Sequence, residues 1–68
     1  MENKDLYVVY ENYTGEVVLM GVPYTQVQKF IIVAAQEMNY GLYRYWQHDD
    51  ETFYDCGPRT YVVKKFNN

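Results

Sequence analysis

A cysteine and a histidine are the side chains here whose chemistry could be catalytic, and the chain has one of each. Cys56 and His48 lie eight residues apart, so a hairpin could bring the imidazole beside the thiol. A histidine in that position activates a cysteine as a nucleophile. No pattern marks an oxyanion hole or an orienting third group, although Asp49, Asp50 and Asp55 are close in sequence. We therefore interpret Cys56 as a small apolar residue in a turn and His48 as solvated, and we predict no enzyme.

An acidic cluster surrounds His48 and raises the question of a metal site. Its members are His48, Asp49, Asp50, Glu51 and Asp55. Calcium loops of the EF-hand type place oxygen ligands at alternating positions around a glycine, and no glycine lies between positions 48 and 55. One cysteine and one histidine are too few for a zinc site without carboxylates or a second chain. We predict no metal and no cofactor, and interpret the cluster as a solvated hairpin tip that suits a basic partner surface.

Aromatic residues are the third candidate group. Four of them could form a stacking platform for single-stranded nucleic acid: Tyr43, Tyr45, Trp46 and Phe53. Such platforms work beside a basic groove. The basic residues that could supply one are few: Arg44, Arg59, Lys64 and Lys65. The net charge is −3, and the Gly-aromatic signature of the common RNA-binding sheet is absent. Nucleic-acid binding is therefore the alternative function, and mimicry of nucleic acid by the carboxylates is a subtype of protein binding.

Nine of the 68 residues are tyrosine. A domain this small cannot enclose nine such rings, so several should lie partly exposed at the surface. Exposed tyrosine is typical of surfaces that recognise other proteins. The chain is therefore interpreted as one that binds a partner.

The residue pattern predicts the elements that must position these groups. Alternation and turn residues predict strands over 5–12, 16–22, 42–48 and 60–66, with a short strand over 52–55. A helix is predicted over 26–39, with Thr25 as N-cap and Gly41 at its end. Its apolar stripe consists of Val27, Phe30, Ile31, Ala34 and Met38. Ile32 and Val33 fall outside this stripe, either leaning onto the sheet or forming a second contact face.

This order predicts an α+β fold: an antiparallel sheet of four strands, or five with the short one, with one helix on one face. One domain covers residues 1–68. The predicted core consists of Leu6, Val8, Val17, Leu19, Val27, Phe30, Ile31, Ala34, Met38, Leu42, Trp46 and Val62. The surplus tyrosines are expected on the sheet face away from the helix.

Composition limits the cellular setting. A single cysteine excludes an internal disulfide framework, so a partner chain is the plausible supplement to a small core. No signal peptide is visible, and the longest apolar run, 30–35, is far shorter than a bilayer span. We expect a complete, small cytoplasmic protein with no membrane association, of the kind that phages and prophages encode.

The leading prediction is a non-enzymatic protein-binding module, such as an inhibitor, adaptor or regulatory protein. Its contact surface is predicted to combine the tyrosine-rich sheet face with the acidic tip. The residues are Tyr43, Tyr45, Tyr61, Asp49, Asp50 and Glu51. A homodimer is compatible with this function, and Ile32 and Val33 are its predicted contact.

Overall fold

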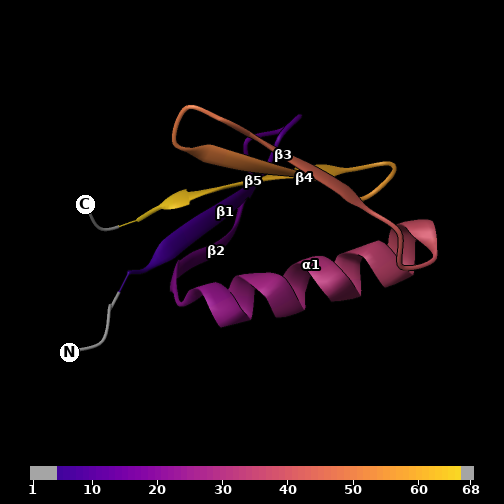
Figure 1. Cartoon of the computed structure of the whole chain (residues 1–68), viewed down its shortest axis with the longest axis horizontal. Coiled ribbons are helices and arrows are strands. Elements are labelled where there is room, and N and C mark those ends of the chain that lie inside the picture. Colours follow the sequence, from indigo (N-terminus) through magenta and orange to yellow (C-terminus); the bar gives the residue numbers. More distant parts are fainter. Residues whose placement is uncertain (1–4, 67–68) are drawn as a thin grey trace.

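The computed structural model describes residues 5–66, which form one helix and a five-stranded antiparallel sheet (Figure 1). The elements are β1 (Tyr7–Glu11), β2 (Val17–Val22), α1 (Tyr24–Asn39), β3 (Arg44–His48), β4 (Glu51–Asp55) and β5 (Thr60–Lys65). The predicted α+β fold is confirmed, and the short fourth strand is a full member of the sheet. The ends of the predicted domain, residues 1–4 and 67–68, lie outside the described range.

The strand order in the sheet is β2-β1-β5-β4-β3. β5, the last strand in the sequence, lies between β1 and β4 in the sheet. Strands from the two ends of the chain are therefore neighbours near the centre of the sheet. The connection from β2 to β3 must therefore cross the sheet from one edge to the other. Five strands span ~19 Å, and a 16-residue helix is ~24 Å long. A helix of this length can connect the two edges, and Figure 1 shows α1 lying beneath the sheet, where its main contacts are with β1 and β2.

The ends of α1 differ slightly from the prediction. The helix begins at Tyr24, and its N-cap is Pro23 rather than Thr25. Pro23 has no backbone N–H to lose at this position, and its carbonyl accepts hydrogen bonds from the N–H groups of Gln26 and Val27. At the other end, Tyr40 takes the left-handed conformation, with φ of 58°. This turn directs the chain out of the helix towards β3.

The helix packs on the opposite face of β1 from the one predicted. Val9 is fully enclosed in the core with α1, and Glu11 is buried, whereas Val8 is only half-buried. Because side chains alternate along a strand, Tyr7, Val9 and Glu11 share the helix-facing side. A shift of one position moves every apolar residue of a strand to the other face, so the predicted inner residues Leu6 and Val8 were placed wrongly.

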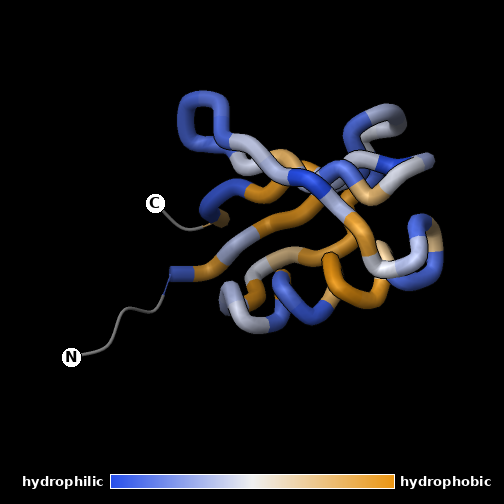
Figure 2. Tube along the Cα trace, turned by 45° about the vertical axis from the view of Figure 1, so that its right-hand side comes forward, coloured by the Kyte–Doolittle hydropathy of each residue, from blue (hydrophilic) through white to orange (hydrophobic). Residues whose placement is uncertain are grey.

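The core therefore differs in part from the predicted one. Its buried residues are Val9, Val27, Ile31, Ala34, Ala35, Tyr54, Cys56, Tyr61 and Val63. Three predicted stripe residues of the helix are buried, and Phe30, Met38 and Leu19 pack partly buried against the core. Three predicted core residues are instead exposed: Val17, Leu42 and Trp46. Figure 2 shows hydrophobic stretches along the strands in the middle of the picture and along parts of the helix below them.

The face of the sheet away from α1, here called the outer face, carries one continuous apolar row. Cross-strand pairing joins Val17 to Tyr10, Tyr10 to Val62, Val62 to Phe53 and Phe53 to Trp46. The row crosses all five strands. Val62, in its middle, is only 1% exposed although it lies on the side away from the helix. Its neighbours in the row therefore bury it, as cross-strand pairs do.

Candidate functional site

The most exposed apolar part of the described chain runs from the end of α1 into β3. Five large apolar side chains within seven residues are exposed here, and we call them the aromatic edge: Tyr40, Leu42, Tyr43, Tyr45 and Trp46. Their exposed fractions range from 40% at Tyr43 to 95% at Tyr40. β3 is an edge strand of the sheet, so within the described residues its second side borders solvent rather than another strand.

Local hydrogen bonds fix the path of the aromatic edge. After the left-handed Tyr40, the backbone N–H of Gly41 donates to the carbonyl of Ala35 at 2.9 Å. The N–H of Leu42 donates to the carbonyl of Asn39 at 3.0 Å, and the Asn39 side-chain amide donates to the carbonyl of Leu42 at 3.1 Å. These bonds hold the connection close to the helix end, so the exposed side chains project from a defined backbone.

Two rings of the aromatic edge pack on a buried tyrosine on the helix-facing side of the sheet. Tyr43 and Tyr45 each have their ring centroid 5.8 Å from that of Tyr54. The Tyr54 hydroxyl shares a short hydrogen bond with the hydroxyl of Tyr24, whose ring packs edge-on against Tyr7. Burial raises the pKa of Tyr54, with the bond to Tyr24 as the second cause. We call these five residues the tyrosine cluster.

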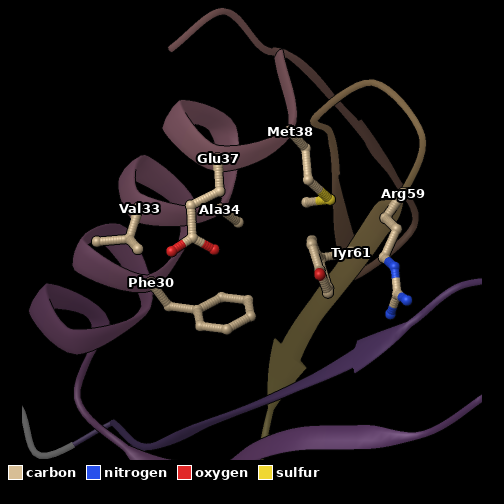
Figure 3. A pocket seen from close by; sticks show the side chains of 7 residues that line it. All are labelled: Phe30, Val33, Ala34, Glu37, Met38, Arg59 and Tyr61. Atoms are coloured by element: carbon tan, nitrogen blue, oxygen red, sulfur yellow. The ribbon is translucent and has the colours of Figure 1, made fainter. Parts of the chain in front are cut away.

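The predicted location of the binding tyrosines is therefore wrong in one respect. Tyr43, Tyr45 and Tyr61 were expected on the face away from the helix, but they lie on the helix-facing side. Tyr61 is only 6% exposed and packs edge-on against Phe30, with ring centroids 5.0 Å apart. Its remaining surface lines a groove of about 350 Å³ between α1 and β5, where Figure 3 shows Phe30, Met38 and Tyr61 turned inwards. Tyr43 and Tyr45 stay at the surface because α1 does not cover β3.

The three acidic residues predicted at the hairpin tip, Asp49, Asp50 and Glu51, have two different environments. Asp49 and Asp50, here called the acidic turn, are exposed at the end of the β3–β4 hairpin, the hydrophilic loop at the upper left of Figure 2. Glu51, the third predicted residue, belongs to β4 and is half-buried on the outer face. Its carboxylate accepts a hydrogen bond from the Tyr10 hydroxyl at 3.0 Å and lies 3.6 Å from the Lys64 amine. Glu51 is therefore engaged within the sheet.

A hollow beside the tyrosine cluster connects it to the acidic turn. It has a volume of about 620 Å³, and its lining includes Tyr7, Tyr24 and Asp50. The volume is within the range of natural ligand pockets, but the hollow is open and half polar. Lys64 and Lys65 also line this hollow, so its charged residues are mixed in sign around the tyrosine rings.

The sites considered for catalysis and metal binding are separated in the fold. His48 pairs with Glu51 at one end of the β3–β4 ladder, whereas Cys56 follows the opposite end. Cys56 is fully buried, and burial raises the pKa of its thiol, which disfavours the nucleophilic thiolate. Among residues 5–66, no group of three or more cysteine, histidine or acidic side chains is placed to hold a metal ion.

The stacking platform that was considered for nucleic acid does not exist as one surface. Tyr43 and Tyr45 lie on the helix-facing side, whereas Trp46 stacks on Phe53 on the outer face, with ring planes 1° apart. Three of the basic residues that could have formed a groove beside the platform lie close to carboxylates instead. Arg44 lies 3.3 Å from Asp55, Lys64 3.6 Å from Glu51, and Lys65 3.2 Å from Asp5.

Ile32 and Val33 are exposed on α1, with exposed fractions of 47% and 51%. The adjacent Ile31 is 1% exposed, so the helix has a sharp boundary between its two sides. Whether Ile32 and Val33 contact a second copy stays a prediction.

One residue that sequence reasoning missed is Glu11, whose carboxylate holds the β1–β2 turn. Its Oε1 accepts hydrogen bonds from the backbone N–H groups of Tyr13 and Thr14 and from the Thr14 hydroxyl. These bonds, with those from Thr14 first, lower the pKa of Glu11, and the charge of Arg59 contributes. Within the described residues, Oε2 is enclosed with no hydrogen-bond partner. The signal available in the sequence is a glutamate just before an Asn-Tyr-Thr-Gly turn.

Glu11 should make stability depend on pH. Because its folded pKa lies below the ordinary 4.5, its contribution is complete above that value and is lost as the pH falls through the folded pKa. We expect Glu11→Gln to lower the urea midpoint at neutral pH, with the difference shrinking in acid. Glu16→Gln, at an exposed residue of the same turn, is the control. Equal midpoints for wild type and Glu11→Gln at neutral pH would contradict this role.

Comparison with known proteins gives no relative: no family model matches the chain, and no curated protein or solved structure is significantly similar. Within the described part of the chain, no helix has both the length and the apolar character needed to cross a bilayer.

Proposed function

We propose that this chain is a non-enzymatic protein-binding module, such as an inhibitor, adaptor or regulatory protein, that binds through the aromatic edge and the acidic turn. The aromatic edge itself is the observation that carries this proposal. Five large apolar side chains are exposed within seven residues at an uncovered margin of the sheet. Single exposed apolar residues are ordinary, but neighbouring ones on one surface mark an interaction site, and Tyr43 and Tyr45 lie together on the helix-facing side against Tyr54.

The way the tyrosines are held favours protein recognition. Tyr43 and Tyr45 rest on the buried ring of Tyr54, which is itself tied to Tyr24 of the helix. Rings that are already ordered lose little rotamer freedom on binding, so more of their contact energy appears as affinity. The exposed part of each ring and its hydroxyl remain for the partner.

The acidic turn points to the kind of surface that the partner presents. Asp49 and Asp50 are exposed beside the tyrosine cluster, and Asp50 lines the same hollow as Tyr7 and Tyr24. A partner with a basic patch beside an apolar contact would complement this arrangement. Exposed charges of this kind mainly speed association and select the partner, whereas the buried rings supply most of the affinity.

Nucleic-acid binding is the second candidate, and the geometry favours it less. The four rings that would stack on bases are divided between two faces, and Arg44, Lys64 and Lys65 face carboxylates rather than an open groove. The two functions differ in their salt dependence. Affinity led by phosphate contacts falls steeply with added salt, whereas a tyrosine-led protein contact changes less.

A tagged pull-down from a bacterial lysate, with and without nuclease, tests the proposal. We expect one protein to be retained by both preparations, identified by mass spectrometry, and lost from the bait that carries Tyr45→Ala. Tyr13→Ala is the matched control, because Tyr13 is 82% exposed in the distant β1–β2 turn. Captured material that disappears with nuclease would support nucleic-acid binding. Retention by the Tyr45→Ala bait would remove the aromatic edge from the interface.

A further inference from the structure

β3 presents a free strand edge in the described structure. It pairs with β4 on one side, and no other strand of residues 5–66 lies on its second side. All five of its residues are exposed. Because hydrogen-bonded and non-hydrogen-bonded pairs alternate in an antiparallel ladder, every second residue directs its N–H and C=O outwards. An exposed edge of this kind is a template for another strand.

The opposite edge of the sheet is less suited to pairing. The ladder between β1 and β2 has register shifts at two places, and Gly21 within β2 has a φ of +70°. Irregularities of this kind twist a strand and protect an edge from further pairing. The β3–β4 ladder runs through five consecutive pairs with no register shift. The two edges are therefore different in kind, and β3 is the regular one.

The apolar row of the outer face ends at the free edge, on Trp46. The row runs from Val17 across the sheet to the Phe53–Trp46 stack, and Trp46 remains 45% exposed. Trp46 is also the central residue of β3. A second strand placed symmetrically against β3 would cover this ring and extend the row.

The charges of β3 decide the direction of such a strand. Arg44 lies at its start, and the acidic turn, Asp49 and Asp50, follows its end. In a second β3 running antiparallel, with Trp46 opposite Trp46, Arg44 of each copy lies opposite His48 of the other, and Asp49 and Asp50 follow one and two residues beyond. A parallel arrangement would bring like charges together. The antiparallel direction therefore brings the Arg44 end of one copy near the acidic end of the other, whereas the parallel direction opposes like charges.

We propose that two copies of this chain pair through β3 in an antiparallel arrangement centred on Trp46, which makes one continuous sheet from two five-stranded halves. This goes beyond the proposed function, because it needs no other partner and uses the backbone edge and the outer face. The pairing brings the tyrosine rows of two copies side by side on the helix-facing side of that sheet. The resulting two-fold contact is isologous, the commonest kind in homodimers.

The test is the association state of paired charge-reversal variants, measured by sedimentation equilibrium. The wild type should approach twice the 8.2 kDa mass of one chain as concentration rises. Arg44→Glu and Asp50→Lys should each raise the dissociation constant about tenfold or more, because each makes both symmetric contacts repulsive. An equimolar mixture of the two variants should associate again, because the mixed dimer restores opposite charges at both contacts.

The equimolar mixture of variants distinguishes association through β3 from a loss of contacts within one chain. Arg44 also lies 3.3 Å from Asp55 of its own hairpin, and its loss there would not be repaired by adding Asp50→Lys chains. Trp46 is the sole tryptophan, so its fluorescence should shift to shorter wavelength on mixing as the ring leaves water. Circular dichroism of each variant checks that the fold is retained.

Three results would overturn the proposal. One is a wild type that stays at the mass of one chain at its highest soluble concentration. The second is a mixture that associates no better than its two components. The third is loss of association in Ile32→Glu, because that substitution is remote from β3 and lies on the other predicted self-association surface. Under the proposal, Ile32→Glu leaves the dissociation constant unchanged.

Discussion

Replacing Ile31 by alanine should remove most of the stability of this fold. Ile31 is 1% exposed and is among the largest fully buried side chains of the described chain. Truncation of a buried isoleucine to alanine costs about 2–5 kcal/mol, because transfer energy is lost and a cavity remains. A chain of this size has a free energy of unfolding of roughly 3–10 kcal/mol in total. The variant should therefore unfold at much lower urea concentration and be partly unfolded at physiological temperature.

The next residue provides a matched control. Ile32 has the same side chain and is 47% exposed, so Ile32→Ala should change the free energy of unfolding by about 0.5 kcal/mol or less. Urea titrations followed by circular dichroism give both values. If the two variants had equal midpoints, the position of the boundary between the buried and exposed sides of α1 would be wrong.

Truncating Tyr43 and Tyr45, the two most exposed tyrosines of the tyrosine cluster, should cost most of the affinity for the protein partner. Tyr43 and Tyr45 are supported by Tyr54 and open to solvent on one side, which is the condition of an interface anchor. Removal of such a ring costs about 2 kcal/mol or more, which corresponds to a roughly 30-fold rise in dissociation constant. Asp50→Asn should cost less and should mainly slow association.

This comparison is made by calorimetry or surface binding with the partner recovered from the pull-down. Tyr13→Ala again serves as the control, because it removes an exposed tyrosine from another part of the surface. Sedimentation of each variant separates loss of partner binding from loss of self-association, since Tyr45 lies on β3. Unchanged affinity in both Tyr43→Ala and Tyr45→Ala would remove the tyrosine cluster from the interface.

The two proposals can fail separately. A chain that is monomeric in every experiment can still bind a target through the tyrosine cluster, and a chain that pairs through β3 can lack any other partner. If both hold, pairing would cover Trp46 and engage the acidic turns, and would leave Tyr43 and Tyr45 of both copies on the helix-facing side. A target with two-fold symmetry would then gain affinity from simultaneous contact.

The site was only partly accessible to sequence reasoning. The composition indicated surplus tyrosine, and Tyr43 and Tyr45 are exposed, although on the helix-facing side rather than on the predicted face. Tyr61 is buried against Phe30, and Glu51 is occupied by Tyr10 and Lys64. Nothing in a single sequence separates a tyrosine that closes a core from one that faces solvent, because the same ring suits both environments.

The sequence by itself determined the type and approximate bounds of each element. The 3.6-residue stripe through Val27 and Ile31 defined the helix, and turn residues around Gly15 and Pro58 separated the strands. These signals are local, since they depend on side-chain periodicity and on backbone conformations that few residues tolerate. They were sufficient for the α+β class and for placing Ile32 and Val33 outside the buried stripe of the helix.

Only the tertiary structure decided which face of each strand meets the helix and where the last strand lies. Both faces of β1 are apolar, with Val8 and Tyr10 on one and Tyr7 and Val9 on the other. The alternation of side chains along the strand therefore does not indicate which face packs against the helix. The placement of β5 between β1 and β4 depends on pairing between residues of β1 and β5 that are 50 to 58 positions apart. Such contacts depend on the packing of the whole chain, and this packing buried Tyr54 and Tyr61 while leaving β3 as a free edge.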